Sequence, residues 1–189
     1  MDDRTRKLSF SIGLGLVGLL LAAASPAADA PPCPARQGLG LATVAAEAWS
    51  ADAMLVYVEN DEPVDAAGSS ARWGYLFYSA KLDRARAWSV SGGHIVVAEN
   101  LDMGFNAPSV SQDWLDSGAA LAAAERGGGA EFRKESHGTL ATMLLMRGAF
   151  SERDPDVTTW TFVYRAPDAP SLFVVVDAAA GKVQRTWRG

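Results

Sequence analysis

The sequence predicts an α+β fold made of two repeated units, each a helix packed on an antiparallel β-sheet. Three observations lead to this prediction. Aromatic residues occupy every second position in two separate segments, apolar runs rich in β-branched residues follow or precede them, and a helical pattern stands ahead of each set. The 189 residues are enough for one domain or two small ones.

The C-terminal stretch carries the strongest strand signal. Trp160, Phe162 and Tyr164 alternate with polar or smaller residues, which predicts a strand with one buried face. The run Leu172 to Val176 predicts a second strand. Asp177 to Gly181 predicts a tight turn into a third strand, because Asp bonds backbone amides in turns and Gly accepts a positive φ.

The first half begins with an amphipathic helix that should end near residues 50–52. Its apolar positions follow the i, i+3, i+4 pattern of one helix face: Leu41, Val44, Ala45, Ala48 and Trp49. Alternation and turn residues then predict four strands, with Trp73, Tyr75 and Phe77 on one face of the second: Met54–Glu59, Arg72–Ser79, Arg84–Ser91 and His94–Glu99.

The second half also contains a helix ahead of its strands. Val110 to Leu115 is expected to be a short strand, and Asp116 or Ser117 to cap a helix that runs to about Arg126. Gly127 to Gly129 should stop that helix. Residues 130–136 favour one or two further helical turns, and Thr139–Arg147 reads as an apolar strand.

The two halves share order, spacing and an aromatic signature. Met54 precedes Trp73 by 19 positions, and Met143 precedes Trp160 by 17. These matches predict a tandem repeat, with a first unit at residues 41–108 and a second at 109–189. Units of this size bury little surface alone, so the two units should pack together.

Alternation also assigns apolar residues to the sheet face away from the helices. A sheet covered by helices on one side should be polar on the other. Something should therefore cover this face: the other unit, which we favour, a second copy, or a partner protein. The residues assigned to it are Leu76, Tyr78, Val163, Leu172, Val174 and Val176.

The N-terminus has the pattern of a secretory signal peptide. Three basic residues precede an uncharged run from Leu8 to Ala24, and small residues with Pro follow. We expect residues 1–30 to be removed and residues 31–40 to be a Pro-rich linker; an uncleaved membrane anchor is the alternative. The predicted location is the periplasm or the exterior of a bacterium.

Composition excludes several kinds of partner and one kind of cross-link. A net charge of −5 gives no reason to expect a nucleic-acid partner, because nucleic-acid binding needs clustered Lys and Arg. No membrane contact is expected beyond the signal segment. Cys33 is the one cysteine, so no intrachain disulfide can form. It lies in the predicted linker between prolines, and we expect no specific role for it, with pairing between chains as the alternative.

No residue set predicts catalysis, cofactor binding or a metal centre. His94 and His137 have no partner in the sequence, no Gly-x-Ser-x-Gly motif is present, and three scattered His and Cys residues do not make a zinc site. No phosphate-binding or dinucleotide motif is present. We therefore expect no catalytic, cofactor-binding or metal residues, no cofactor, and no enzyme activity.

Two acidic loops supply the carboxylates that calcium prefers. Neither loop follows the twelve-residue calcium-binding pattern, and each contains Pro, so solvated loops are the favoured interpretation and calcium the alternative. Their acidic residues are Glu59, Asp61, Glu62 and Asp65 in the first loop, and Glu152, Asp154 and Asp156 in the second.

The second half resembles the PepSY domain family. The resemblance rests on the Ala-rich segment Ser117 to Arg126, the strand from Trp160 to Tyr164, and the ending from Val174 to Val183, which reads Val-Val-Val-Asp-Ala-Ala-Ala-Gly-Lys-Val. It covers roughly residues 113–187. The first half lacks the Asp-Ala and Gly-Lys-Val pieces, and Ala180 stands where the family often has Thr.

The resemblance implies an exported, non-catalytic module that binds or restrains a peptidase or another envelope protein. It transfers no catalytic residues. Two alternatives from other classes remain: an enzyme of unfamiliar type that uses loop carboxylates or a histidine, and a structural protein that assembles with itself.

Overall fold

The computed structural model describes residues 30–101, 108–148 and 156–189. The predicted signal peptide lies outside the described residues apart from Ala30. In chain order the elements are α1 (Ala35–Trp49), β1 (Met54–Asn60), β2 (Arg72–Ser79), β3 (Arg84–Ser91), β4 (His94–Leu101), α2 (Ser117–Ala124), the π-helical turn η1 (Glu125–Gly129), α3 (Ala130–Ser136), β5 (Thr139–Arg147), β6 (Thr158–Ala166), β7 (Ala169–Asp177) and β8 (Val183–Arg188).

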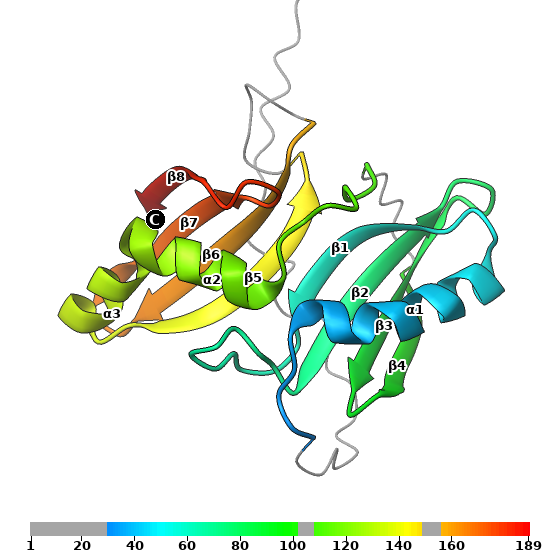
Figure 1. Ribbon diagram of the computed structural model, residues 1–189, viewed down its shortest axis with the longest axis horizontal. Helices are drawn as coiled ribbons and strands as arrows, with labels where there is room; N and C mark the ends of the chain where they lie inside the picture. The colour runs from blue at the N-terminus through cyan, green and yellow to red at the C-terminus, as the bar shows by residue number, and fades with distance from the viewer. Residues whose placement is uncertain (1–29, 102–107, 149–155) are drawn as a thin grey trace, which may run out of the picture.

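All eight strands form one continuous antiparallel sheet in the order β4-β3-β2-β1-β5-β6-β7-β8 (Figure 1). The join is between β1 and β5, where Tyr57 pairs with Met146, Val58 with Leu145 and Glu59 with Leu144. The prediction of two repeated helix-on-sheet units is therefore wrong. A separate four-stranded unit would leave an edge of β1 with unpaired amides and carbonyls, and pairing with β5 satisfies them.

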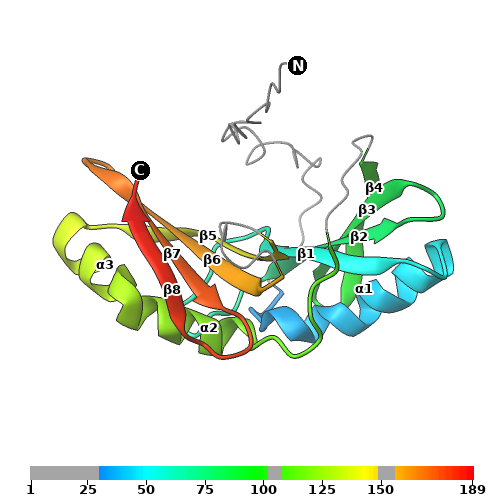
Figure 2. The ribbon, with the colours of Figure 1, turned by 90° about the horizontal axis from the view of Figure 1, so that it is seen from above.

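The helices lie on one face of this sheet, and no described helix covers the other (Figure 2). Both ends of the sheet rise away from the helices in this view, so the face without helices is concave. We call it the helix-free face. Right-handed strand twist, accumulated over eight strands, favours such curvature.

The main core lies between the sheet and the helices. The predicted aromatic alternation is confirmed on β2 and β6, where all six rings are buried on the helix side. Trp73 and Trp160 meet edge to face across the two central strands, with ring centroids 6.4 Å apart. The buried rings are Trp73, Tyr75, Phe77, Trp160, Phe162 and Tyr164.

The apolar side chains of β7 lie on the opposite face of the sheet from the one predicted. Val174 and Val176 stand directly opposite Phe162 and Trp160 in the β6–β7 ladder, so they share the helix-side face with those rings. Leu172, opposite Tyr164, does the same. The prediction that Leu172, Val174 and Val176 face the other way is wrong, because period-2 alternation fixes which residues share a face and the cross-strand register decides which face that is.

Leu76 and Tyr78 do lie on the helix-free face, as predicted. They form a second buried cluster with Val56 and Ala85. Val56 is brought there by an irregularity of β1 between Leu55 and Tyr57. The helix-free face is thus apolar over part of β1, β2 and β3.

Two other predictions of local structure also differ. Helix α1 begins at Ala35, so residues 35–40 of the predicted linker are helical. Residues 110–115 are not a strand. At one end of this segment Val110 N donates to Leu55 O of β1 (2.8 Å), and at the other end Leu115 N donates to Ala178 O in the turn after β7 (2.7 Å). Periodicity cannot separate such an extended segment from a strand.

The glycines after α2 bend the helix without stopping it. Helical backbone continues through Gly127, Gly128 alone adopts a non-helical conformation with φ 120°, and α3 then runs on to Ser136. The predicted stop at Gly127–Gly129 is therefore a kink, which glycine permits because it lacks a Cβ.

The start of α1 is capped by residues about 80 positions away. Its N-cap residue, Pro34, has no side chain able to accept a hydrogen bond. Ser117 Oγ accepts from Ala35 N (3.0 Å), and Asp116 Oδ1 accepts from Arg36 N (3.0 Å) and Ser117 N (2.8 Å). The starts of α1 and α2 lie side by side in both views (Figures 1 and 2). The hydrogen bonds of the Asp116 carboxylate to the first amides of both helices place it at their positive ends.

Replacing Ser117 with Ala should lower the free energy of unfolding by about 1–2 kcal/mol, because a buried helix-terminal amide loses its acceptor. Urea denaturation followed by circular dichroism measures this. Ser171→Ala, at a half-buried serine whose hydroxyl has no described hydrogen bond, is the control. Equal loss in the two variants would contradict the shared cap.

Two glycines of α1 should respond to alanine in opposite directions. A Cβ at Gly38 would lie 2.6 Å from Tyr75 Oη and 3.1 Å from Val90 Cβ, whereas a Cβ at Gly40 would meet nothing within 4 Å. Gly38→Ala should destabilise by about 1–3 kcal/mol through overpacking. Gly40→Ala should stabilise by up to about 1 kcal/mol through helix propensity. Thermal unfolding of both variants would show the two signs.

Candidate functional site

A polar row crosses the centre of the helix-free face. Glu59 of β1 stands opposite Gly74 of β2 on one side and Leu144 of β5 on the other. Gly74 in turn pairs with Ser89, and Leu144 with Thr161. Because directly opposite residues point to the same face, these five residues line up on that face with Glu59 in the middle.

Asp61 joins this row from the residue after β1. Its amide donates to Arg72 O (3.0 Å), which continues the ladder and keeps Asp61 on the same face as Glu59. Its carboxylate lies over Gly74, where a Cβ would approach Oδ1 to 2.8 Å. The glycine therefore leaves room for the acid, and the Asp61 side chain is only 10% exposed.

The carboxylates on this face outnumber their cation. Arg72 Nη2 pairs with Glu62 Oε1 (2.7 Å), and Arg72 Nε lies 3.7 Å from Asp61 Oδ2. Glu59 accepts a hydrogen bond from the Tyr57 hydroxyl (2.7 Å) and has no ion pair among the described residues. We name Glu59, Asp61 and Glu62 the acidic strip.

Burial raises the pKa of Glu59, and the hydrogen bond from Tyr57 opposes that rise only in part. Burial likewise raises the pKa of Asp61 against the opposing effects of a hydrogen bond from Ser89 and the charge of Arg72. The pKa of Tyr57 is raised by burial and by the nearby Glu59 charge. Both carboxylates are thus ionised at a free-energy cost, which is common where a residue serves binding or catalysis.

Several buried polar atoms on this face have no partner. Thr161 is 1% exposed and Thr159 0%, and neither hydroxyl has a hydrogen bond within residues 30–101, 108–148 and 156–189. Asp61 Oδ2 also has none. Buried polar groups in folded proteins are nearly always hydrogen bonded, so a group of exceptions indicates a place where partners come from elsewhere.

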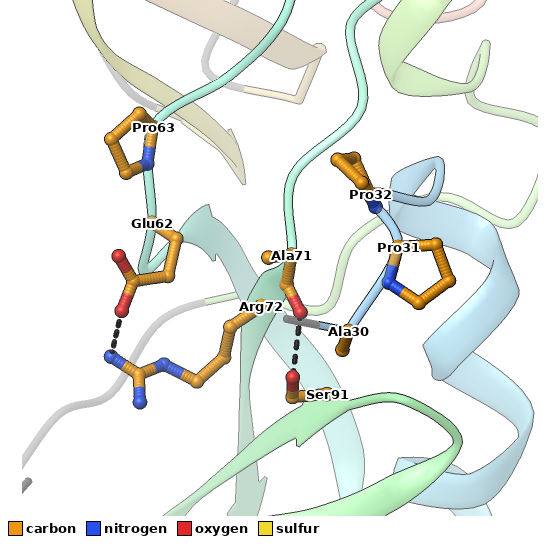
Figure 3. A pocket seen from close by; sticks show the side chains of 8 residues that line it. All are labelled: Ala30, Pro31, Pro32, Glu62, Pro63, Ala71, Arg72 and Ser91. Atoms are coloured by element: carbon orange, nitrogen blue, oxygen red, sulfur yellow. Dashed lines mark hydrogen bonds and ion pairs between the residues drawn. The ribbon is translucent and has the colours of Figure 1, made fainter. Parts of the chain in front are cut away.

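A pocket of about 500 Å³ lies at the end of the acidic strip, beside the start of the described chain (Figure 3). The Glu62–Arg72 ion pair lies on one side of it, and Ser91 donates to Ala71 O (2.8 Å) on the other. The residues that line it are Ala30, Pro31, Pro32, Glu62, Pro63, Ala71, Arg72 and Ser91.

The histidines and the cysteine considered in the sequence analysis are not part of the acidic strip or of the lining of its pocket. His94 is exposed at the start of β4, with Nδ1 2.9 Å from Gly92 O, and His137 follows α3 with φ 52°. Neither lines this pocket or a second one of about 330 Å³ between the β1–β2 loop and α2–α3. Cys33 belongs to the fold: its backbone pairs with Ser70, and burial raises the pKa of its thiol.

The described side chains of the acidic loops bond within their own surroundings. Asp65 accepts hydrogen bonds from Ala67 N and Ser69 N of its own loop (both 2.8 Å), and Asp156 pairs with Arg147 (3.1 Å). Glu152 and Asp154 lie outside the described residues. In the described ranges, no three His, Cys, Asp or Glu side chains are placed to hold a metal ion.

Sequence reasoning considered Glu59 and Asp61 only as loop ligands for calcium and missed the strip. Two signals could have found it. Glu59 ends an apolar strand, where a charge is unusual, and Gly74 interrupts an aromatic strand, which often marks close approach of another group.

Comparison with known proteins gives a shared fold. No family model matches the chain, and no curated protein matches it. A crystal structure of a "putative lipoprotein" from Clostridium difficile 630 is similar, with a TM-score of 0.54 and 14% sequence identity over 86% of this chain and 97% of that one. Within the described ranges no helix has the length and apolar character needed to cross a bilayer.

Replacing Glu59 with Gln should raise stability at pH 7. A carboxyl whose pKa is raised by folding stabilises the fold most below its unfolded pKa, and that contribution is lost as pH rises through the folded pKa. Glutamine keeps the acceptor for Tyr57 without the buried charge. The melting temperature of Glu59→Gln should exceed that of the wild type at pH 7, and the difference should shrink toward pH 4.

Glu47→Gln, on the exposed side of α1, is the matched control and should show a smaller difference between the two pH values. A Glu59→Gln variant less stable than the wild type at pH 7 would contradict the assignment of Glu59 as a strained charge.

Proposed function

We propose that this chain is an exported binding protein whose helix-free face holds a segment of another extracytoplasmic protein. One observation carries the proposal: buried polar atoms without partners lie beside a row of under-neutralised carboxylates on a concave sheet. Such a surface gains when a partner supplies the missing donors and charge.

Two further points support the location and the class. The predicted signal peptide directs the chain out of the cytoplasm, and the similar structure belongs to a protein described as a lipoprotein. The PepSY resemblance implies a partner of the peptidase class, and restraint of such an enzyme is the specific form of the proposal.

The contrast between the two faces supports binding. On the helix side the polar groups of the two central tryptophans are satisfied within the chain, because Trp73 Nε1 donates to Cys33 O (2.8 Å) and Trp160 Nε1 to Leu115 O (2.9 Å). On the helix-free side, the hydroxyls of Thr159 and Thr161 have no hydrogen bond to any described residue. The helix-free face is therefore the face with unused interaction capacity.

A steric block on this face should abolish partner capture. Leu144, half-buried next to Glu59, can be replaced with Trp, and the exposed Ala122 of α2 provides a matched control on the opposite side. Residues 31–189 of each form would be exported in the bacterium that makes the protein and cross-linked there to neighbouring envelope proteins. The wild type and Ala122→Trp should capture the same proteins. The amount of these proteins captured by Leu144→Trp should be at least tenfold lower.

Circular dichroism would verify that both variants fold. Capture retained by a folded Leu144→Trp would show that the partner does not use this face. Capture of nothing by any form, together with turnover of a small substrate by the purified chain, would favour the enzyme alternative.

A further inference from the structure

The acidic strip points to the chemistry of the bound segment. Resting on the proposed function, we propose that the partner presents an arginine side chain to Glu59 and Asp61 at the centre of the helix-free face. Three features of this site favour an arginine: its free acceptors, its charge balance and the absence of a metal-binding arrangement among the described residues.

The free acceptors suit a planar cation with several donors. Tyr57 donates to Oε2 of Glu59, and Oε1 has no described hydrogen bond. Oδ2 of Asp61 is buried without a hydrogen bond among the described residues, 3.7 Å from Nε of Arg72, which has none either. The two residues lie two positions apart on one face, a separation of about 6–7 Å. A guanidinium carries five N–H donors in a fixed fork and can serve two such carboxylates at once.

The charge balance leaves room for one more cation. Glu59, Asp61 and Glu62 face the single guanidinium of Arg72, which already pairs with the last two. The Asp61 side chain is only 10% exposed and Glu59 is half-buried, so a cation placed beside them gains more than it would at an exposed carboxylate.

The neighbours of the strip can hold the rest of a peptide. Thr161, two strands away from Glu59 along the same row, offers a buried hydroxyl that has no hydrogen bond to the described residues. In the other direction the pocket beside Arg72 provides about 500 Å³. A segment that runs along the row from Thr161 toward this pocket would meet polar groups on both sides of its arginine.

A metal ion fits this site less well. In the part of the chain that the structure describes, no three His, Cys, Asp or Glu side chains are arranged to hold one. The donors that remain, two carboxylate oxygens from neighbouring positions and a hydroxyl two strands away, are too few and too spread for hard-cation coordination. They match a long organic cation on a peptide.

The test compares two probes that differ at one residue. The pentapeptides acetyl-Gly-Val-Arg-Val-Gly-amide and acetyl-Gly-Val-Gln-Val-Gly-amide would be titrated into residues 31–189 while amide resonances are followed by NMR. The arginine peptide should shift the amides of Glu59, Asp61 and Thr161 and bind at least tenfold more tightly than the glutamine peptide.

The double variant Glu59→Gln/Asp61→Asn should remove that tenfold preference, and Glu47→Gln should keep it. Equal binding of the two peptides, binding that the double variant retains, or shifts confined to other faces would each overturn the arginine assignment. A lysine version of the peptide separates a need for charge alone from a need for the guanidinium fork: equal binding of lysine and arginine would overturn the guanidinium claim.

Failure here is distinguishable from failure of the proposed function. If Leu144→Trp abolishes capture of the partner while the arginine peptide does not bind, the face is a binding surface for another chemistry. If Leu144→Trp leaves capture intact, the surface itself is misassigned, whatever the peptides do.

Discussion

Backbone pairing between β1 and β5 is the constraint on which the rest of this structure depends. It joins eight strands into one sheet and removes two edges that would otherwise expose unpaired amides and carbonyls. The same pairing brings Glu59 beside Leu144 and sets Trp73 near Trp160. The centre of the core on one face and the centre of the candidate site on the other are therefore fixed by a single ladder.

The helices of the two halves are tied to each other by side chains that act over long sequence distances. Ser117 and Asp116 cap α1, and the guanidinium of Arg36 lies 3.9 Å from the ring centroid of Trp114. The indole N–H groups of Trp73 and Trp160 and the starts of α1 and α2 have their hydrogen-bond partners on this side. The helix-free face lacks that internal completion, and this difference makes it the candidate interaction surface.

The acidic strip illustrates a trade between stability and function. Burial raises the pKa of Glu59 and of Asp61, and so disfavours their charged forms. Neutral residues of similar shape would make the fold more stable. The similar lipoprotein structure shares the overall arrangement at 14% identity, which shows a common fold and leaves the chemistry of the surface to this chain's own residues.

The sequence alone determined the local elements: the bounds of β2, β3 and β5 were predicted to the residue, and the rings of β2 and β6 were placed on a buried face, because alternation reports local burial. It did not determine how the halves join, since a pattern shows that a strand has a buried face and does not show which strand lies beside it. Register decided that Val174 and Val176 share the helix side, and the β1–β5 ladder replaced two expected units with one sheet. The acidic strip was likewise a product of tertiary structure, because Glu59, Gly74, Ser89 and Thr161 acquire a common face only when four different strands align them.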